Sequence, residues 1–192
     1  MSQATDGELM GLVARGDRAA FADLVERHQR RLTAYLGRLC GSGDHAEELA
    51  QESFVRLFQA AAGYRDEGRL LPYLFRIGTN LLRTEERRRR RWQLLAPMVA
   101  NGNGHGYGHA PGGGEESLLR AELQRRVRQE LMRLPFRFRV PLVLFEVEEW
   151  SLAEIAGLLG CRQGTVKSRL HRGRVRLRRA LTPYCQEGAA DE

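Results

Sequence analysis

A glycine-rich segment in the second half of the chain most constrains how this protein folds. Residues 101–114 read NGNGHGYGHAPGGG, so half of them are Gly and apolar bulk is almost absent. Such a segment cannot bury enough surface to offset the entropy lost on ordering it. The sequence therefore predicts a flexible linker over residues 97–115, with one domain at residues 6–96 and a second at residues 116–183.

Hydrophobic periodicity predicts that both domains are helical. In the first domain apolar residues recur at helical spacings from Phe21 to Leu39, from Ala50 to Ala61 and from Leu74 to Leu82. In the second they do so from Leu118 to Leu131 and from Val166 to Leu181. No segment shows the alternation of a half-buried strand. We expect a further helix over residues 137–148, with Pro141 in its first turn, and the predicted fold class is all-α.

The charge of the chain predicts a polyanionic partner. Lys and Arg together number 31 against 24 Asp and Glu, which gives a formal net charge of +7, and Lys167 is the single lysine. Arg is better suited than Lys to fork onto phosphates and guanine edges. No apolar run approaches the roughly 18 residues of a membrane span, so we expect no membrane insertion. The first ten residues lack the pattern of a secretory signal.

The cysteines and histidines do not predict a metal site or another cofactor. Cys40, Cys161 and Cys185 are odd in number and far apart, which disfavours a disulfide framework and fits a cytoplasmic protein. His105 and His109 lie in the linker without a carboxylate or thiol at ligand spacing. We therefore expect no metal and no cofactor.

The strongest local signal is a helix-turn-helix over residues 151–174. Ser151 and Glu154 form a capping box before a short apolar helix, Gly160 suits the turn, and a basic helix follows. Eight Lys or Arg lie between residues 162 and 179 without one acidic residue, which argues against a helix made basic only for solubility. The predicted base and phosphate contacts on its polar side are Lys167, Ser168, His171, Arg172 and Arg174.

A second basic signal closes the last helix of the first domain. Residues 87–91 are five consecutive Arg, for which we favour a phosphate-binding role over base reading. Aromatic and amide groups precede them, and such groups stack unpaired bases or read a flipped base. These residues are Tyr64, Tyr73, Phe75, Arg76 and Asn80, of which we expect Phe75 to belong to the core.

An acidic helix face indicates a protein partner. Its members are expected to point away from Phe54 and Phe58, and they are Asp44, Glu47, Glu48, Gln51 and Glu52. This face offers nothing to DNA and fits a partner with a basic surface. Compensation of the helix dipole is the alternative, and it explains Glu47 and Glu48 better than Gln51 and Glu52.

Four segments together resemble the extracytoplasmic-function sigma factors, the small bacterial sigma factors that keep only the second and fourth conserved regions. They are EELAQESF at residues 47–54, YLFRIGTN at 73–80, LAEIA at 152–156 and GTVKSRLHR at 164–172. Tyr73 stands where the family usually has Trp. Gly173 stands where Ala is usual, which we expect to soften the last helix by about 1 kcal/mol.

The resemblance implies a promoter-specificity subunit with two kinds of partner. Glu48, Gln51 and Glu52 would dock on the clamp helices of the largest subunits of core RNA polymerase. The segment from Tyr64 to Arg83, with Tyr73, Arg76 and Asn80, would open the minus-ten element. Lys167, Ser168, His171, Arg172 and Arg174 would hold the minus-thirty-five element. Many members also bind an anti-sigma protein.

Two other function classes remain open at this point. A stand-alone helix-turn-helix regulator would explain the second domain but not the acidic face. A nucleic-acid enzyme such as a nuclease would need clustered carboxylates and a metal, and no P-loop, G-x-S-x-G or H-E-x-x-H motif is present. We expect a protein that is not an enzyme.

Overall fold

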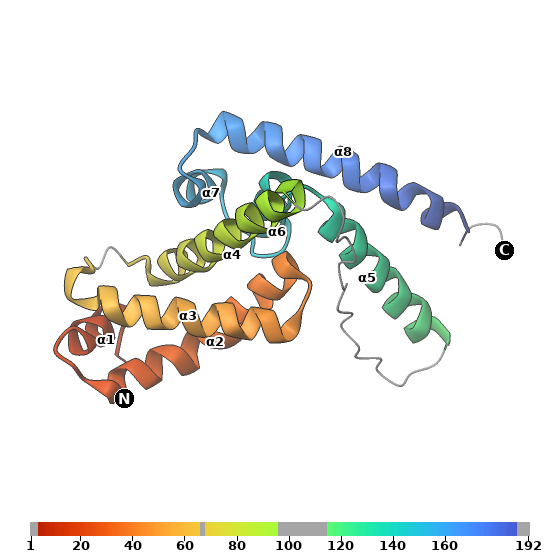
Figure 1. Ribbon diagram of the computed structural model, residues 1–192. Coiled ribbons are helices and arrows are strands. Elements are labelled where there is room, and N and C mark those ends of the chain that lie inside the picture. Colours follow the sequence, from red (N-terminus) through yellow and green to blue (C-terminus); the bar gives the residue numbers. More distant parts are fainter. Residues whose placement is uncertain (1–3, 66–67, 96–114, 188–192) are drawn as a thin grey trace. The chain divides into compact units, whose positions relative to one another are not determined.

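A computed structural model describes residues 4–65, 68–95 and 115–187. These residues are helical and turn segments, without a strand among them, and the all-α prediction is confirmed. The chain separates into two compact units, residues 1–37 with 43–104 and residues 38–42 with 105–192. Figure 1 follows the helices along the chain. The predicted linker and its His105 and His109 lie outside the described residues, apart from Glu115, which begins a helix.

The first unit contains four α-helices and a short 3-10 turn. They are α1 (Asp6–Val13), α2 (Arg18–Cys40), α3 (Gly43–Ala60), η1 (Ala61–Gly63) and α4 (Leu70–Leu95). The predicted periodic stretches coincide with α2, α3 and α4. Sequence reasoning did not single out α1, although Thr5 and Glu8 supply its local signal. The Thr5 hydroxyl accepts the Glu8 N–H at 3.2 Å, and the Glu8 carboxylate accepts the Thr5 N–H at 2.6 Å.

The Asp6 carboxylate of α1 contacts two side chains of α2. Asp6 Oδ1 lies 2.8 Å from Arg27 Nη1, and Asp6 Oδ2 lies 2.8 Å from His28 Nε2. Leu9, Met10 and Val13 supply the buried side of α1. A helix of this length is marginal alone, so its stability comes from these contacts.

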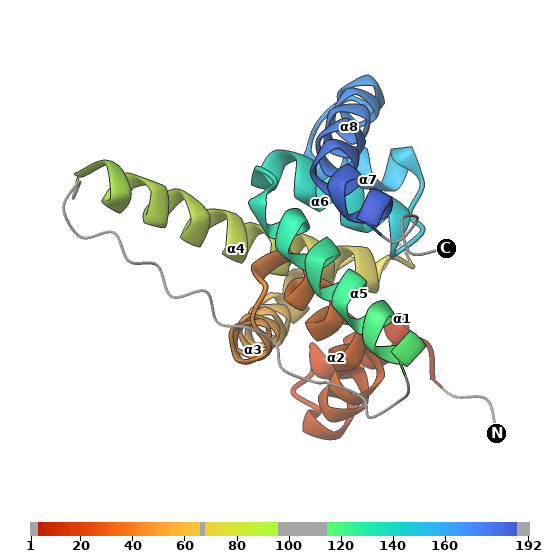
Figure 2. The same cartoon turned by 90° about the vertical axis from the view of Figure 1, so that its right-hand side faces the viewer.

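The core of the first unit is aliphatic with one aromatic stack at its centre. Tyr35 of α2 and Phe75 of α4 stack with ring centroids 4.3 Å apart, and Phe75 is fully buried, which confirms its predicted core position. Helices α3 and α4 pack along each other. The C-terminal half of α4 then runs beyond the ends of α2 and α3 (Figure 2).

The second unit contains α5 (Glu115–Arg133), α6 (Phe136–Glu146), α7 (Leu152–Leu159) and α8 (Gln163–Glu187). Helix α8 packs on α5, α6 and α7. The guanidinium of Arg139 is buried and donates to the carbonyl oxygens of Met132 at 2.9 Å and Leu134 at 3.0 Å. It thereby satisfies carbonyls at the C-terminal end of α5 that the helix itself leaves unpaired.

Pro141 is not in the first turn of its helix as expected. Helix α6 begins at Phe136, directly after Pro135, whose carbonyl accepts the N–H of Phe138 at 2.8 Å. Pro141 is therefore inside the helix and buried. The helix tolerates it because the surrounding apolar residues of α6 are buried too, so tertiary packing outweighs the lost backbone hydrogen bond.

Candidate functional site

The helix-turn-helix of the second unit is built by local signals. The Ser151 hydroxyl accepts the Glu154 N–H at 3.3 Å, and the Glu154 carboxylate accepts the Ser151 N–H at 2.8 Å, so the predicted capping box is present. Gly160 ends α7 with φ 62° and ψ 44°, a left-handed conformation that favours Gly. Val166 and Leu170 are buried and hold α8 in place.

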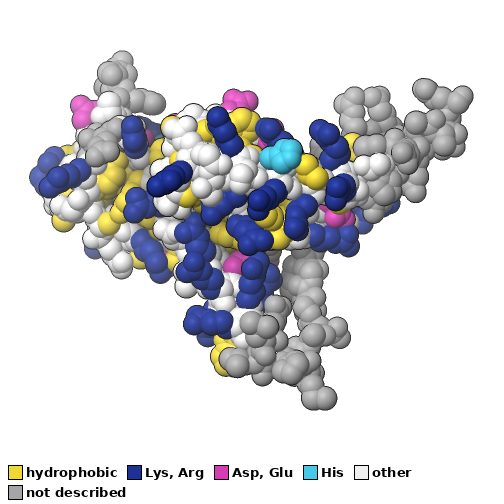
Figure 3. Space-filling model, turned by 90° about the horizontal axis from the view of Figure 1, so that it is seen from above, with side chains coloured by type: hydrophobic (Ala, Val, Ile, Leu, Met, Phe, Trp, Pro, Cys, Tyr) yellow, Lys and Arg dark blue, Asp and Glu magenta, His cyan; other side chains and the backbone are white. Residues whose placement is uncertain are grey.

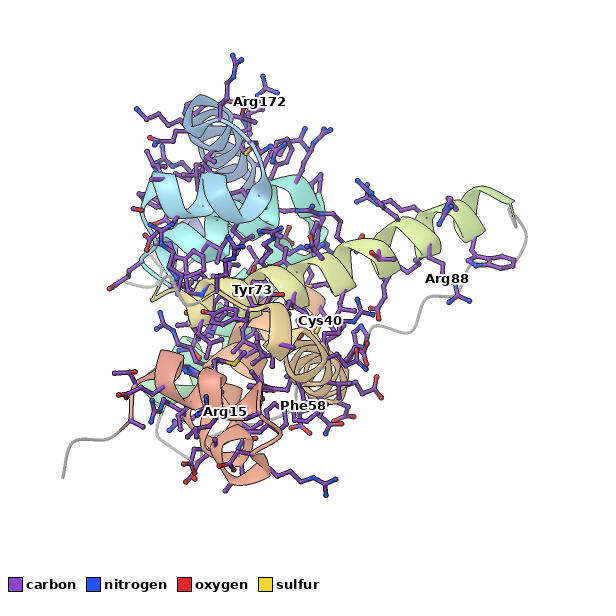
Figure 4. All side chains as sticks on the ribbon, turned by 90° about the vertical axis from the view of Figure 1, so that its left-hand side faces the viewer. Arg15, Cys40, Phe58, Tyr73, Arg88 and Arg172 are labelled. Atoms are coloured by element: carbon purple, nitrogen blue, oxygen red, sulfur yellow. The ribbon has the colours of Figure 1, made fainter. Side chains whose placement is uncertain are left out.

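The polar side of α8 presents most of the predicted DNA contacts to solvent. Lys167, Ser168, His171 and Arg172 are all exposed. At about 100° per residue, Ser168, His171 and Arg172 lie on the side opposite Val166, and Lys167 flanks them. Arg172 points outward from α8 in Figure 4, and Figure 3 shows Lys and Arg side chains gathered over this surface with few acidic ones. A helix of this kind can enter a major groove.

Arg174 differs from the other residues predicted for this face. Its Nε lies 2.7 Å from Glu146 Oε1, and its guanidinium lies 5.1 Å from the centroid of the Phe145 ring. Both partners belong to α6, so Arg174 lies at the edge of the face and packs against its own domain. The helical wheel placed it on the flank, but spacing within one helix does not reveal the acid on a neighbouring one.

A second set of predicted residues shares one stripe of α4. Tyr73, Arg76, Asn80 and Arg83 follow each other at spacings of three, four and three, which keeps them within one narrow sector of the helix. Arg76 and Asn80 are exposed. Tyr64 comes from the turn after η1, and its ring centroid lies 5.5 Å from that of Tyr73. The fold therefore joins an aromatic pair to an amide and to basic groups, which suits unpaired bases and phosphates.

Two buried residues immediately before Asn80 set the rotation of α4. The Thr79 hydroxyl lies 2.7 Å from the Tyr35 hydroxyl in the core. A Cβ on Gly78 would come within 3.0 Å of Leu36 Cδ2 and 3.2 Å of Ser53 Oγ, so the α4 backbone approaches both neighbours closely. Because these two positions face inward, Asn80 and Arg76 must face outward.

The acidic face on α3 is exposed, and two of its members have partners within the first unit. Glu48, Gln51 and Glu52 all reach solvent. His45 lies between two carboxylates, with its Nδ1 3.4 Å from Glu48 Oε2 and its Nε2 2.9 Å from Glu85 Oε2 of α4. Glu52 Oε1 accepts from Arg56 Nε at 2.7 Å. Glu48 remains 77% exposed and stays accessible to a partner.

The acidic face was expected to point away from both Phe54 and Phe58, but Phe58 lies on the same side of α3 as this face. Phe54 is buried, but Phe58 is 40% exposed and Val55 is 48% exposed on the same side of α3 as Gln51. The Phe58 ring packs against the Phe21 ring of α2, with centroids 5.1 Å apart. The face is therefore mixed acidic and apolar. Gln51 and Phe58 are seven residues apart, and this spacing places them on the same side of a helix. The sequence reasoning missed this signal.

The described residues contain neither a metal-binding cluster nor a helix suited to span a membrane. No group of three or more His, Cys, Asp or Glu side chains there is arranged to hold a metal ion. Within the same residues, no helix combines the length and the apolar character needed to cross a bilayer.

Comparison with protein families matches both units. The family described as Sigma-70 region 2 matches residues 24–93, and the family described as Sigma-70, region 4 matches residues 124–177. These matches fall inside the domains predicted from the sequence. They also cover the α3, α4 and α8 faces described above.

Two solved structures that resemble this chain each contain a second protein. A structure of CnrH in complex with the cytosolic domain of CnrY has a TM-score of 0.67 and 25% identity, covering 94% of this chain and 99% of that one. The sigma factor RpoE of Bartonella quintana, in complex with the anti-sigma factor NepR, has a TM-score of 0.69. At 23% identity, over 84% of this chain and 96% of that one, it supports the fold alone.

Curated relatives align over nearly the whole chain. The ECF RNA polymerase sigma factor SigW of Bacillus subtilis is 33% identical over 173 residues, which is 88% of this chain and 92% of SigW. The RNA polymerase sigma-H factor of Pseudomonas aeruginosa is 30% identical over 194 residues, which is 97% of this chain and 99% of that protein. With two sigma-70 regions on two helical units, this chain belongs to the ECF RNA polymerase sigma factors and serves transcription initiation.

Proposed function

We propose that this sigma factor divides its work among three surfaces. The α3 face, defined by Glu48, Gln51, Glu52, Val55 and Phe58, binds core RNA polymerase. The α4 stripe, defined by Tyr64, Tyr73, Arg76, Asn80 and Arg83, captures the melted minus-ten strand. The polar side of α8, with Lys167, Ser168, His171 and Arg172, binds the minus-thirty-five duplex, and Arg174 supports its edge.

The observation that carries the proposal is the opposite character of two faces within one unit. Helices α3 and α4 pack together, yet α3 presents exposed carboxylates beside Val55 and Phe58, whereas α4 presents Arg76 and Asn80. DNA is repelled by the first surface and attracted by the second. A chain that carries both is suited to hold a protein and a nucleic acid at the same time.

This chain acts through binding energy and does not itself make or break covalent bonds. Unstacking a base step costs a few kcal/mol, and stacking on aromatic side chains returns about 1–3 kcal/mol per base. Each module binds weakly alone, but tethering raises the effective concentration of the second contact once the first has formed. We therefore propose a cytoplasmic protein that is not itself an enzyme.

A partner that restrains the factor is a second part of the proposal. The two solved neighbours are bound to NepR and to the cytosolic domain of CnrY. The exposed Val55 and Phe58 offer this chain an apolar area of the kind that protein partners cover. An anti-sigma protein that covers the α3 face would exclude polymerase by direct competition.

Run-off transcription with purified core polymerase tests the proposal. Fragments of the host genome serve as templates, and core enzyme without the factor is the control. Promoter-dependent transcripts that require the chain are expected. Tight and specific binding to promoter duplex without polymerase, together with no transcript, would instead favour a stand-alone regulator, which the relatives do not support.

A further inference from the structure

An acidic side chain from α6 lies at the edge of the polar side of α8. Arg174 Nε donates to Glu146 Oε1 at 2.7 Å, although the two residues are 28 positions apart in the chain. Residues 162–179 carry eight Lys or Arg and no acid. A carboxylate beside such a surface repels phosphates. By charge alone, Glu146 is therefore unfavourable for a helix that binds DNA.

The stability of the second unit does not explain why an acid stands at this position. Glu146 is the last residue of α6, and the last turn of this helix contains no basic residue. The C-terminal end of a helix dipole is negative, so a carboxylate there is unfavourable for the helix. The side chains of Arg174 and Glu146 are 49% and 45% exposed, and a surface ion pair of this kind contributes little to folding.

The guanidinium of Arg174 is held at one edge and on one face. Its Nε is paired with Glu146, and its central carbon lies 5.1 Å from the centroid of the Phe145 ring, within the range of a cation–π contact. Among the described residues, the terminal nitrogens Nη1 and Nη2 have no hydrogen-bond partner. These two nitrogens can form the fork with which Arg binds a phosphate. The contacts from α6 therefore order the side chain and leave this fork free.

A neighbouring arginine of α8 lacks the carboxylate. Arg176 lies over the Phe138 ring of α6 at 5.2 Å, which resembles the contact of Arg174 with Phe145. Within the described part of α8, however, Arg174 is the single cation that forms an ion pair with a carboxylate. Arg174 also stands seven residues after Lys167, so both lie on one flank of α8, about 10 Å apart along its axis. The ordered arginine is therefore the one at the edge of the predicted DNA-binding side.

We propose that Glu146 is a positioning residue for DNA binding, which holds Arg174 Nε so that the free fork is ordered for a phosphate at the edge of the minus-thirty-five duplex. This inference rests on the proposed role of the polar side of α8 and extends it to α6. A free Arg side chain loses rotamer freedom when it binds a phosphate, and this loss weakens binding. Glu146 and Phe145 restrict the side chain before DNA arrives, so that part of the loss is already met during folding.

The sign of one substitution tests the proposal. Glu146→Ala in the holoenzyme should weaken binding to a promoter fragment by about two- to tenfold, the effect expected for releasing one ordered side chain. Removal of an acid from a DNA-binding surface by charge alone would strengthen binding. The matched control is Glu149→Ala, because Glu149 is exposed in the segment after α6 and has no ion pair among the described residues. Unchanged or higher affinity in Glu146→Ala, or an equal loss in the control, overturns the proposal.

Substitutions of Arg174 show whether Glu146 acts through this side chain. In an Arg174→Ala background, Glu146→Ala should cause no further loss. In an Arg174→Lys background, one ammonium has to serve both the carboxylate and the phosphate, so Glu146→Ala should strengthen binding. An equal loss in all three backgrounds would show a structural role only and would overturn the proposal.

Two further measurements separate this inference from loss of folding and from the proposed function. Thermal unfolding of each full-length variant should give a Tm close to that of the wild type, because both members of the pair are about half exposed. The wild-type holoenzyme is also tested on fragments with intact and scrambled minus-thirty-five elements. Equal affinity for the two fragments contradicts the proposed function of α8. A preference for the intact element together with full affinity in Glu146→Ala overturns this inference alone.

Discussion

The hydroxyl groups of Tyr35 and Thr79 lie 2.7 Å apart in the core of the first unit, one residue before Asn80. This hydrogen bond joins α2 to α4. It helps to set which side of α4 faces solvent, and therefore where the minus-ten stripe lies.

Removing one partner of this pair should destabilise the first unit. Tyr35→Phe leaves the buried Thr79 hydroxyl without its partner, which we expect to cost about 1–2 kcal/mol in free energy of unfolding. Urea unfolding followed by circular dichroism measures it. The double variant with Thr79→Val should cost less than the sum of the two single changes, because both polar groups are then gone. Strict additivity would show that the hydrogen bond carries no coupling.

Reversing the α3 face should weaken binding to polymerase without weakening the DNA-binding module. Glu48→Lys with Gln51→Ala inverts the charge of an exposed surface, so affinity for core enzyme should fall by at least tenfold, which corresponds to about 1.4 kcal/mol. Fluorescence anisotropy of the labelled factor measures it. The matched control is Glu26→Lys with Gln29→Ala on the exposed side of α2. Equal affinities for the variant and the control would remove the α3 face from the proposed function.

Removing the Asn80 amide from the α4 stripe should weaken strand opening more than promoter binding. Asn80→Ala removes an exposed group with the hydrogen-bonding capacity to read a flipped base, at an expected cost of about 1–3 kcal/mol to the open complex. Fluorescence of 2-aminopurine placed in the minus-ten element reports opening. Gln59→Ala, an exposed amide on α3, is the control and should open DNA normally. Normal opening by Asn80→Ala would contradict the assignment.

Substitutions on α8 should separate base reading from charge. Arg172→Ala should cost about 1–3 kcal/mol on the preferred minus-thirty-five sequence and less on an altered one. Lys167→Ala should weaken all sequences alike and lower the salt slope by about 1. Competition binding with the holoenzyme measures both, and Arg128→Ala on the exposed side of α5 is the control. If Arg172→Ala lost the same affinity on every sequence, Arg172 would bind phosphate and would not read a base.

Replacing Gly173 of α8 by Ala should stabilise the second unit. Gly173 is buried, and a Cβ there would lie 3.5 Å from the Phe138 carbonyl oxygen and 3.6 Å from Phe138 Cβ, which are ordinary contact distances. Gly173→Ala should therefore gain about 0.5–1 kcal/mol in helix propensity without a clash. Thermal unfolding measures the rise in Tm. A lower Tm would show that α8 uses the close approach to α6.

Sequence patterns predicted the parts of this protein that depend on neighbouring residues in the chain. The capping box of Ser151 and Glu154, the left-handed Gly160 and the period of the long helices involve groups within a few residues of each other. Local chemistry of this kind acts before the chain is folded. The stripe from Tyr73 to Arg83 could be drawn from helical spacing alone for the same reason. The local signal of Thr5 and Glu8 was equally present, and it was overlooked.

The errors and the missed contacts concern segments that are distant in sequence. Phe58 was expected on the hidden side of α3, but Phe21 of α2 covers only part of its ring. The contact of Arg174 with DNA stays a prediction, but its ion pair with Glu146 of α6 could not be foreseen from spacing within α8. Pro141 was expected in a first turn, but it lies further inside the helix, where residues 138–144 are all buried.

By itself, the sequence determined that the chain is helical, that it has two units and which helix sides are basic, because periodicity, capping and charge are properties of short segments. Only the tertiary structure decided which arginines keep acidic partners, which aromatic rings stay exposed and how α4 is rotated about its axis. Those outcomes depend on which helices pack together, and packing is selected by the whole core at once.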